Sequence, residues 1–241
     1  EREHEIESFN PEEFWTLSVN FQDEKNNLIT ASISQLNGNK IEKFSFKNKI
    51  EINKAIENIK DQKFNISDIS SKIISRNPSG PFTTSTLQQV ASSRLGFGAS
   101  RTMQIAQRLY QGIEIDGETI GLITYMRTDG TNLSADAVSD FRDFIKNEYG
   151  NEYLPEKPLN YSGKKAKNAQ EAHEAIRPTD ISRSPDTVKK YLSTDQQKLY
   201  NLIWGRALSS QMETAKFDRN TITITTEDGG TICKSSGSVL K

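Results

Sequence analysis

The sequence contains a single cysteine, Cys233, and no apolar run that approaches the roughly 20 residues needed by a membrane-spanning helix. One cysteine excludes an internal disulfide framework and any zinc site built from cysteines, and it is typical of a reducing, cytosolic compartment. The acidic start of the chain also lacks the positive charge and apolar segment of a signal peptide. We therefore expect a soluble protein that does not associate with a membrane.

Acidic residues are absent from one long window of the chain, between Asp68 and Glu114. The charged residues inside this window are all basic, namely Lys72, Arg76, Arg94, Arg101 and Arg108. A net charge of −1 for the whole chain gives no case for a polyanionic partner, but a local basic stripe is what binding to a phosphate backbone requires. An ordinary solvated surface has the same pattern, so the charge alone leaves both interpretations open.

The secondary-structure pattern changes after a cluster of helix- and strand-breaking residues at 77–81 (NPSGP). Before it, the pattern predicts strands at 14–21, 28–36 and 64–74, with one helix at 49–60. After it, helical spacing dominates until a closing hairpin formed by 221–226 and 231–235. We expect an α+β, multidomain fragment with 77–81 as the domain boundary and a plausible flexing point.

Two helices separated by a short glycine turn are predicted at 83–95 and 99–110. The spacing places Leu87, Val90, Ala91 and Leu95 on the inner face of the first, and Met103, Ala106 and Tyr110 on that of the second. The pair has the layout of a helix-turn-helix. Such pairs serve as packing units more often than as DNA readers, so the motif alone does not establish DNA binding.

The segment 121–130 (GLITYMRTDG) brings an apolar stretch next to several polar and ionisable side chains. If Tyr125 to Arg127 is extended, both side chains project to the same side. A phosphate placed there meets a phenol, which is a candidate nucleophile, and a guanidinium able to donate paired hydrogen bonds to it. An ordinary tyrosine is on the order of 0.1% ionised at pH 7, so forming the phenolate costs about 4 kcal/mol. Asp129 is expected to orient Arg127 or to form a turn.

Five blocks of sequence, in this order, resemble bacterial type IA DNA topoisomerases. They are 81–89 (PFTTSTLQQ), 94–97 (RLGF), 106–110 (AQRLY), 123–129 (ITYMRTD) and 171–178 (EAHEAIRP). The resemblance extends over essentially the whole chain, because 9–15 (FNPEEFW) also resembles the stretch that leads into the family's β-rich arch. One departure is Gly130, where many members carry serine.

The resemblance implies that Tyr125 attacks a phosphodiester of single-stranded or underwound DNA, forming a 5′-phosphotyrosine intermediate and freeing a 3′-hydroxyl. Cleavage and rejoining of one strand in this way relaxes negative supercoils. Arg127 would then contact the scissile phosphate, and the loss of one such donor costs about 3 to 4 kcal/mol of barrier. Further DNA contacts are expected from His173, Arg94, Arg101, Arg108 and Arg177.

The resemblance also implies a layout: 1–20 as the tail of a preceding domain, 21–82 as the first pass through a β-rich hinge or arch domain, 83–211 as the mainly helical domain that carries the tyrosine, and 212–241 as the return to the hinge. No Asp-x-Asp-x-Asp pattern occurs, so we expect the Mg²⁺ site to belong to an N-terminal domain outside this chain. The acidic residues Glu114, Asp116 and Glu118 are interpreted as an exposed loop rather than a metal site. This fragment alone is then expected to be nearly inactive. The whole enzyme is expected to be a monomer in the bacterial cytoplasm, associated with the nucleoid.

Two other functions share part of this pattern. A tyrosine recombinase also uses Tyr, Arg and His, but there the histidine and arginine precede a tyrosine near the chain end, whereas His173 and Arg177 follow Tyr125. A noncatalytic helix-turn-helix DNA-binding module remains the alternative. It would bind DNA in a salt-sensitive way and form no covalent adduct.

Overall fold

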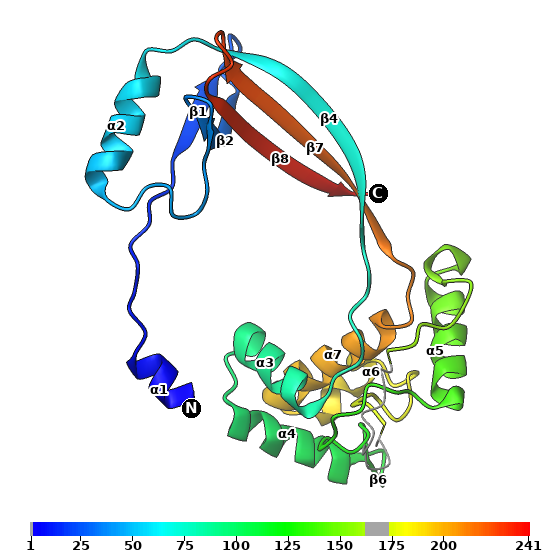
Figure 1. Ribbon diagram of the computed structural model, residues 1–241. Coiled ribbons are helices and arrows are strands. Elements are labelled where there is room, and N and C mark those ends of the chain that lie inside the picture. Colours follow the sequence, from blue (N-terminus) through cyan, green and yellow to red (C-terminus); the bar gives the residue numbers. More distant parts are fainter. Residues whose placement is uncertain (1, 162–173) are drawn as a thin grey trace. The chain divides into compact units, whose positions relative to one another are not determined.

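The computed structural model describes residues 2–161 and 174–241, and the chain divides into two compact units. One unit consists of residues 1–75 and 216–241 and is called the sheet unit here. The other consists of residues 76–215 and is called the helical unit. Figure 1 labels their elements, and each unit is considered by itself below. Mixed helix and sheet content agrees with the predicted α+β class.

The sheet unit contains the antiparallel sheet and two helices. The strands follow the order β1-β2-β8-β7-β4, and a short β3 pairs with β2. The bounds are α1 (Arg2–Glu7), β1 (Ser18–Gln22), β2 (Leu28–Leu36), β3 (Asn39–Lys40), α2 (Lys49–Lys60), β4 (Phe64–Arg76), β7 (Ala215–Thr226) and β8 (Ile232–Leu240). The predicted helix at 49–60 and strand at 28–36 have the observed bounds. The closing hairpin is longer than predicted, since its pairs extend from Phe217 with Leu240 to Thr225 with Ile232.

The core of the sheet unit is small and lies between the sheet and α2. Ile52 and Ala55 of α2 pack with Ile33 of β2 and Cys233 of β8. The helix begins where the Asn48 side chain accepts hydrogen bonds from two main-chain N–H groups of the first turn. Burial raises the pKa of the Cys233 thiol to about 11, so this thiol is neutral and unreactive at physiological pH.

Strand β4 contributes little to that core. Three of its four isoleucines, Ile66, Ile69 and Ile73, are exposed, and the fourth, Ile74, is half-buried. The hydrogen bonds of the sheet, rather than buried side chains, therefore hold most of β4 in place.

In the helical unit, helices α3, α4 and α7 pack together, and α5 and several short elements lie around them (Figure 1). The bounds are α3 (Thr84–Leu95), α4 (Ala99–Gln111), β5 (Ile113–Ile115), β6 (Glu118–Ile120), α5 (Ala135–Glu148), α6 (Pro185–Val188) and α7 (Thr194–Ser209), with 3-10 turns at Asn151–Tyr153 and Lys189–Tyr191. The Ser134 side chain caps α5 by accepting a hydrogen bond from the Ala137 N–H.

Helices α3, α4 and α7 share one apolar core. Leu87 of α3, Leu109 of α4 and Ile203 of α7 are all fully buried in it. The predicted inner face of α4 was partly wrong: Tyr110 is exposed, and the neighbouring Leu109 occupies the buried position. A shift of one residue turns a helix by 100°, which is enough to exchange the two side chains.

The acidic segment predicted to be a loop is in fact a β-hairpin. Strands β5 and β6 pair in register, and Asp116 and Gly117 form the turn with positive φ values of 51° and 91°. Such Asp-Gly turns suit the twist of a two-residue hairpin. Asp116 accepts a hydrogen bond from the Tyr191 hydroxyl and lies 4.0 Å from the Lys190 ammonium.

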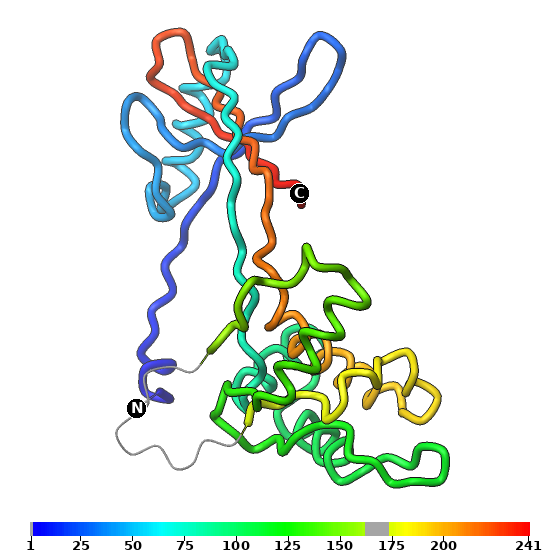
Figure 2. Tube along the Cα trace, turned by 90° about the vertical axis from the view of Figure 1, so that its right-hand side faces the viewer, coloured from blue at the N-terminus to red at the C-terminus, as the bar shows by residue number. Residues whose placement is uncertain are grey.

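The segment 77–81, predicted as a flexing point, is bonded to the rest of the helical unit. Arg206 Nε donates to the Gly80 carbonyl at 2.7 Å, and the Tyr161 hydroxyl lies 3.2 Å from the Pro78 carbonyl. The Thr214 hydroxyl donates to Asn77 Oδ1 at 2.9 Å, which ties the entering segment to the leaving one; Figure 2 shows the two running side by side. A Cβ on Gly80 would approach the Tyr161 ring to 2.9 Å, so the close packing here requires glycine. These contacts place the segment inside the helical unit, and the flexing point stays a prediction.

Candidate active site

The tyrosine-bearing loop links β6 to α5 and alternates between buried and exposed side chains. Met126 and Thr128 are buried, whereas Tyr125, Arg127 and Asp129 are exposed. Alternation of this kind is that of an extended chain with one face on a core. Tyr125 and Arg127 therefore both face solvent, on the side opposite the buried Met126.

The Tyr125 ring packs against the last turn of α4 and stays partly exposed. It packs against Tyr110 in an edge-to-face pair with the ring centroids 5.4 Å apart, and it is 40% exposed. Such a pair restricts the ring without covering it. The exposed position of Tyr110, which the helical pattern did not predict, is explained by this contact.

Two threonine hydroxyls fasten the loop on either side of Tyr125. Thr124 Oγ1 donates to the Ala175 carbonyl at 2.7 Å and accepts from the Arg177 N–H at 3.0 Å. Thr84 Oγ1, at the start of α3, donates to the Met126 carbonyl at 2.7 Å and accepts from the Thr128 N–H at 2.8 Å. The loop is thus bonded to two segments that are distant from it in sequence.

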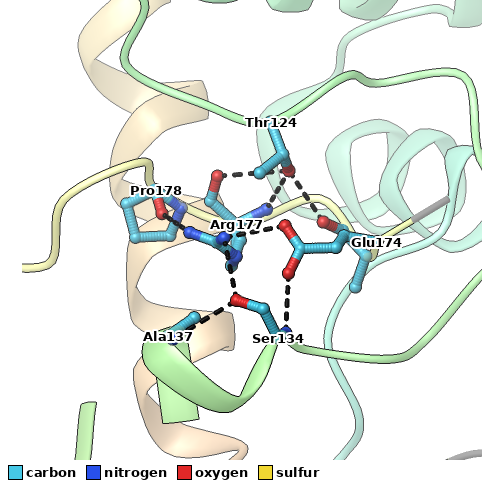
Figure 3. A network of polar contacts seen from close by, with 7 residues as sticks. Thr124, Ser134, Ala137, Glu174, Arg177 and Pro178 are labelled. Carbon is cyan, nitrogen blue, oxygen red and sulfur yellow. Dashed lines mark hydrogen bonds and ion pairs between the residues drawn. The ribbon is translucent and has the colours of Figure 1, made fainter. Parts of the chain in front are cut away.

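A polar network around Arg177 supports the same region (Figure 3). The Arg177 guanidinium pairs with Glu174 at 2.7 Å, donates to the Pro178 carbonyl at 3.0 Å and is only 13% exposed. The other Glu174 oxygen accepts from the Ser134 N–H at the start of α5, at 2.6 Å. Partial burial opposes ionisation of Glu174, but the hydrogen bonds from Ser134 and the charge of Arg177 outweigh it and hold the pKa of this carboxyl below its usual range.

The basic residues predicted to contact DNA differ in how free they are. Arg94 and Arg108 are exposed on α3 and α4. Arg101 is ion-paired with Asp195 at 2.6 Å and lies over the Phe97 ring. Burial lowers the pKa of the Arg206 guanidinium, and the charge of Arg94 lowers it further. These two cations therefore lie close enough to influence each other.

Three further predictions concern Arg177, His173 and Asp129. Arg177 is engaged inside the protein, as described above, and faces the protein interior rather than an open surface. His173 lies outside the described residues. Within those residues Arg127 makes no ion pair with Asp129, so the expected orienting role of Asp129 has no support in the geometry.

Sequence reasoning missed Thr84, Thr124 and Glu174 as parts of this site. The hydroxyl cluster at 83–86 is typical of a helix cap, and Thr83 with Thr86 does form one. Thr84 stands beside the cap and reaches the loop instead. The sequence signal for this role is a threonine, Thr84, that the helix cap does not use.

Neither a metal site nor a membrane span is found where the structure can be described. Residues 2–161 and 174–241 contain no group of three or more His, Cys, Asp or Glu side chains able to hold a metal ion. The hairpin carboxylates do not form one, since Asp116 is engaged with Tyr191. None of the helices described is long and apolar enough to cross a membrane.

Comparison with known proteins gives a consistent family. The family model described as DNA topoisomerase matches residues 1–241. The chain is 48% identical to DNA topoisomerase 1 of Rickettsia prowazekii over 240 residues and 43% identical to that of Haemophilus influenzae over 241. It is fully covered in each alignment but spans only 31% and 26% of those two relatives. The solved structure of full-length topoisomerase I from Thermotoga maritima matches with a TM-score of 0.73 and 35% identity, over the whole of this chain and 36% of that one.

Proposed function

Because the chain belongs to the DNA topoisomerase family, we propose that it supplies the nucleophilic tyrosine of a type IA enzyme that cleaves and rejoins one DNA strand. The phenol oxygen of Tyr125 attacks the phosphorus of a backbone phosphodiester. The bond from phosphorus to the 3′ oxygen breaks, leaving a 3′-hydroxyl and a 5′-phosphotyrosine link. The reverse attack by the 3′-hydroxyl rejoins the strand, and passage of another strand in between relaxes negative supercoils.

The observation that carries this proposal is the exposure of Tyr125 and Arg127 on one side of a loop that is fastened at both ends. A nucleophile must be reachable by a DNA strand, and Tyr125 is 40% exposed on a rigid support. The Arg127 guanidinium, on the same side, is suited to the charge that builds on the phosphate during attack. Fixing both groups on one loop lowers the entropic part of the barrier.

Other residues are given supporting roles. We assign Arg94 and Arg108, which are exposed, to contacts with the DNA backbone, and Arg101 to the same surface once its pair with Asp195 exchanges for phosphate. Arg177 is assigned to holding the loop rather than to binding DNA, because its guanidinium is bonded to Glu174 and Pro178. His173 stays proposed as a DNA contact from the family resemblance alone.

The rest of the reaction requires parts that these 241 residues do not contain. The chain spans about a third of the length of the Rickettsia relative. The described residues do not fit a Mg²⁺ site, so we assign Mg²⁺ to another part of the whole enzyme and derive no step through it. We further propose that the whole enzyme acts as a monomer on single-stranded or underwound DNA in the bacterial cytoplasm, at the nucleoid.

The test uses the whole enzyme and a single-stranded oligonucleotide labelled at its 3′ end. The label then lies on the cleavage product whose 5′-phosphate becomes linked to the tyrosine. With Mg²⁺ present, the label should stay attached to the protein under denaturing conditions and map to Tyr125. Tyr125→Phe should abolish the adduct, since phenylalanine has no nucleophilic oxygen. Arg127→Ala should slow adduct formation about 10²- to 10³-fold, the usual cost of losing one positioned donor.

The alternative function is a noncatalytic DNA-binding module, and the packed pair α3 and α4 with its exposed Arg94 and Arg108 favours it. It predicts salt-sensitive binding of DNA, no covalent adduct and no effect of Tyr125→Phe. The same gel therefore separates the two functions.

A further inference from the structure

The two threonines that bracket Tyr125 have an arrangement that a plain loop would not need. Thr124 directly precedes Tyr125 in the chain, and Thr84 binds the carbonyl of Met126, which directly follows it. We propose that Thr84 and Thr124 are positioning residues for the cleavage reaction: their hydroxyls fix the main chain on both sides of Tyr125 and so set where its phenol oxygen and the Arg127 guanidinium lie. This inference rests on the function proposed above.

Thr124 fixes the chain before the tyrosine. Its N–H donates to the Arg177 carbonyl at 2.9 Å, and its hydroxyl bridges the Ala175 carbonyl and the Arg177 N–H. Ile123 continues the pairing with Pro178 as an isolated bridge. Main chain and side chain of one residue thus bind the same neighbouring segment. Arg177 and Glu174 of that segment pair with each other, and Glu174 accepts a hydrogen bond from the Ser134 N–H at the start of α5 (Figure 3).

Thr84 fixes the chain after the tyrosine. Its N–H donates to the Thr128 carbonyl at 2.8 Å, and its hydroxyl bridges the Met126 carbonyl and the Thr128 N–H. These bonds span Arg127 on both sides. The hydroxyl is not required for the helix, because Thr83 and Thr86 complete the capping box of α3 without it.

The chemistry of the hydroxyl explains why threonine occupies both positions. One hydroxyl donates one hydrogen bond and accepts another, so it can join a carbonyl to an N–H group across a gap. Serine can do the same, while valine has nearly the same shape and can do neither. Loss of the bridge would let the loop shift, and a displacement of about 1 Å at the reacting groups can cost on the order of 10²-fold in rate. The rate of cleavage should therefore fall while DNA affinity is kept.

The experiment compares matched variants of the whole enzyme in single-turnover adduct formation and in DNA binding. We expect Thr84→Val and Thr124→Val to slow adduct formation at saturating DNA about 10- to 100-fold while the Kd for the oligonucleotide changes less than about threefold. Thr84→Ser and Thr124→Ser should retain rates within about threefold of the parent. The matched control is Thr226→Val, because Thr226 is buried in the sheet unit and its hydroxyl likewise donates to Asp228 and accepts from the Thr231 N–H. It should leave the rate unchanged.

The outcomes separate this inference from the function beneath it. If Tyr125→Phe still forms the adduct, the proposed function is wrong and the inference falls with it. If Tyr125→Phe abolishes the adduct but both valine variants cleave at the parent rate, only the positioning roles are wrong. Equal slowing by Thr226→Val, or a failure of the serine variants to retain the rate, also overturns them. Should a valine variant not fold, Thr84→Ala and Thr124→Ala give the same comparison without placing a methyl group against the buried carbonyls.

Discussion

The two units of this chain are stabilised in different ways. The helical unit surrounds one apolar core in which side chains such as Leu87, Leu109 and Ile203 are completely buried. The sheet unit has a smaller core under α2, and its long strand β4 leaves Ile66, Ile69 and Ile73 exposed. The loop that carries Tyr125 belongs to the helical unit. Tyr125, which we propose as the nucleophile, thus lies on a loop supported by a dense core, and the sheet provides no such core along β4.

The largest expected effect comes from a buried apolar side chain of the helical unit, and an exposed one on β4 provides the contrast. Leu87→Ala should lower the free energy of unfolding of the helical unit by about 2 to 5 kcal/mol, because it leaves a cavity in a packed core. Ile69→Ala on β4 should change stability by no more than about 0.5 kcal/mol, since the side chain is 66% exposed. Urea denaturation of each variant measures both. Similar losses for the two variants would contradict the distinction between the units.

A middle-sized effect concerns acid sensitivity. The pKa of Glu174 is lowered in the folded helical unit, so this carboxylate stabilises the fold above its unfolded pKa of about 4.3, and that stabilisation is lost as the pH falls toward the folded value. Glu174→Gln should cost about 1 kcal/mol at pH 7, reduced because the carboxylate is partly exposed, and should reduce the loss of stability below pH 4.3.

Thermal unfolding of parent and variant between pH 7 and pH 3 checks this prediction. The sheet unit provides the comparison, because Asp23 and Asp228 also have lowered pKa values through hydrogen bonds in turns: Asn27 holds the pKa of Asp23 down, and Thr226 that of Asp228. Glu174→Gln should leave their contribution to acid unfolding intact. A variant with the parent's full pH dependence would show that Glu174 is not one of the groups responsible.

The smallest effect is a gain in stability. Gly205 lies inside α7, and a Cβ built there meets no atom within 4 Å. Gly205→Ala should therefore stabilise the helical unit by about 0.5 to 1 kcal/mol, because alanine loses less backbone entropy in a helix. Gly229 at the β7–β8 turn is the contrasting position, since its φ of 70° makes alanine unfavourable there. Denaturation midpoints should move in opposite directions for the two variants.

Much of this fold could be predicted from local sequence pattern. The helix at 49–60 and the strand at 28–36 were predicted with the observed bounds, because periodicity and flanking breakers determine them locally. The hairpin at 113–120 and the exposure of Tyr110 were not. Each depends on contacts with distant residues, such as the Tyr125 ring that covers one side of Tyr110.

The site could be predicted in part, for a similar reason. Alternation along the chain was enough to suggest that Tyr125 and Arg127 share a side. The partners of the loop could not be found in this way, because Thr84 lies about 40 residues before the loop and Glu174 about 50 after it. Hydrogen bonds across such separations leave no periodic signal in one sequence.

The buried thiol of Cys233 makes the chain well suited to spectroscopic labelling. Because the only native cysteine is buried and its pKa is raised to about 11, a maleimide dye or spin label at neutral pH should react instead with a cysteine introduced on the surface. Pairs of such labels, one in each unit, would report the distance between the units as DNA binds, without first replacing a native residue.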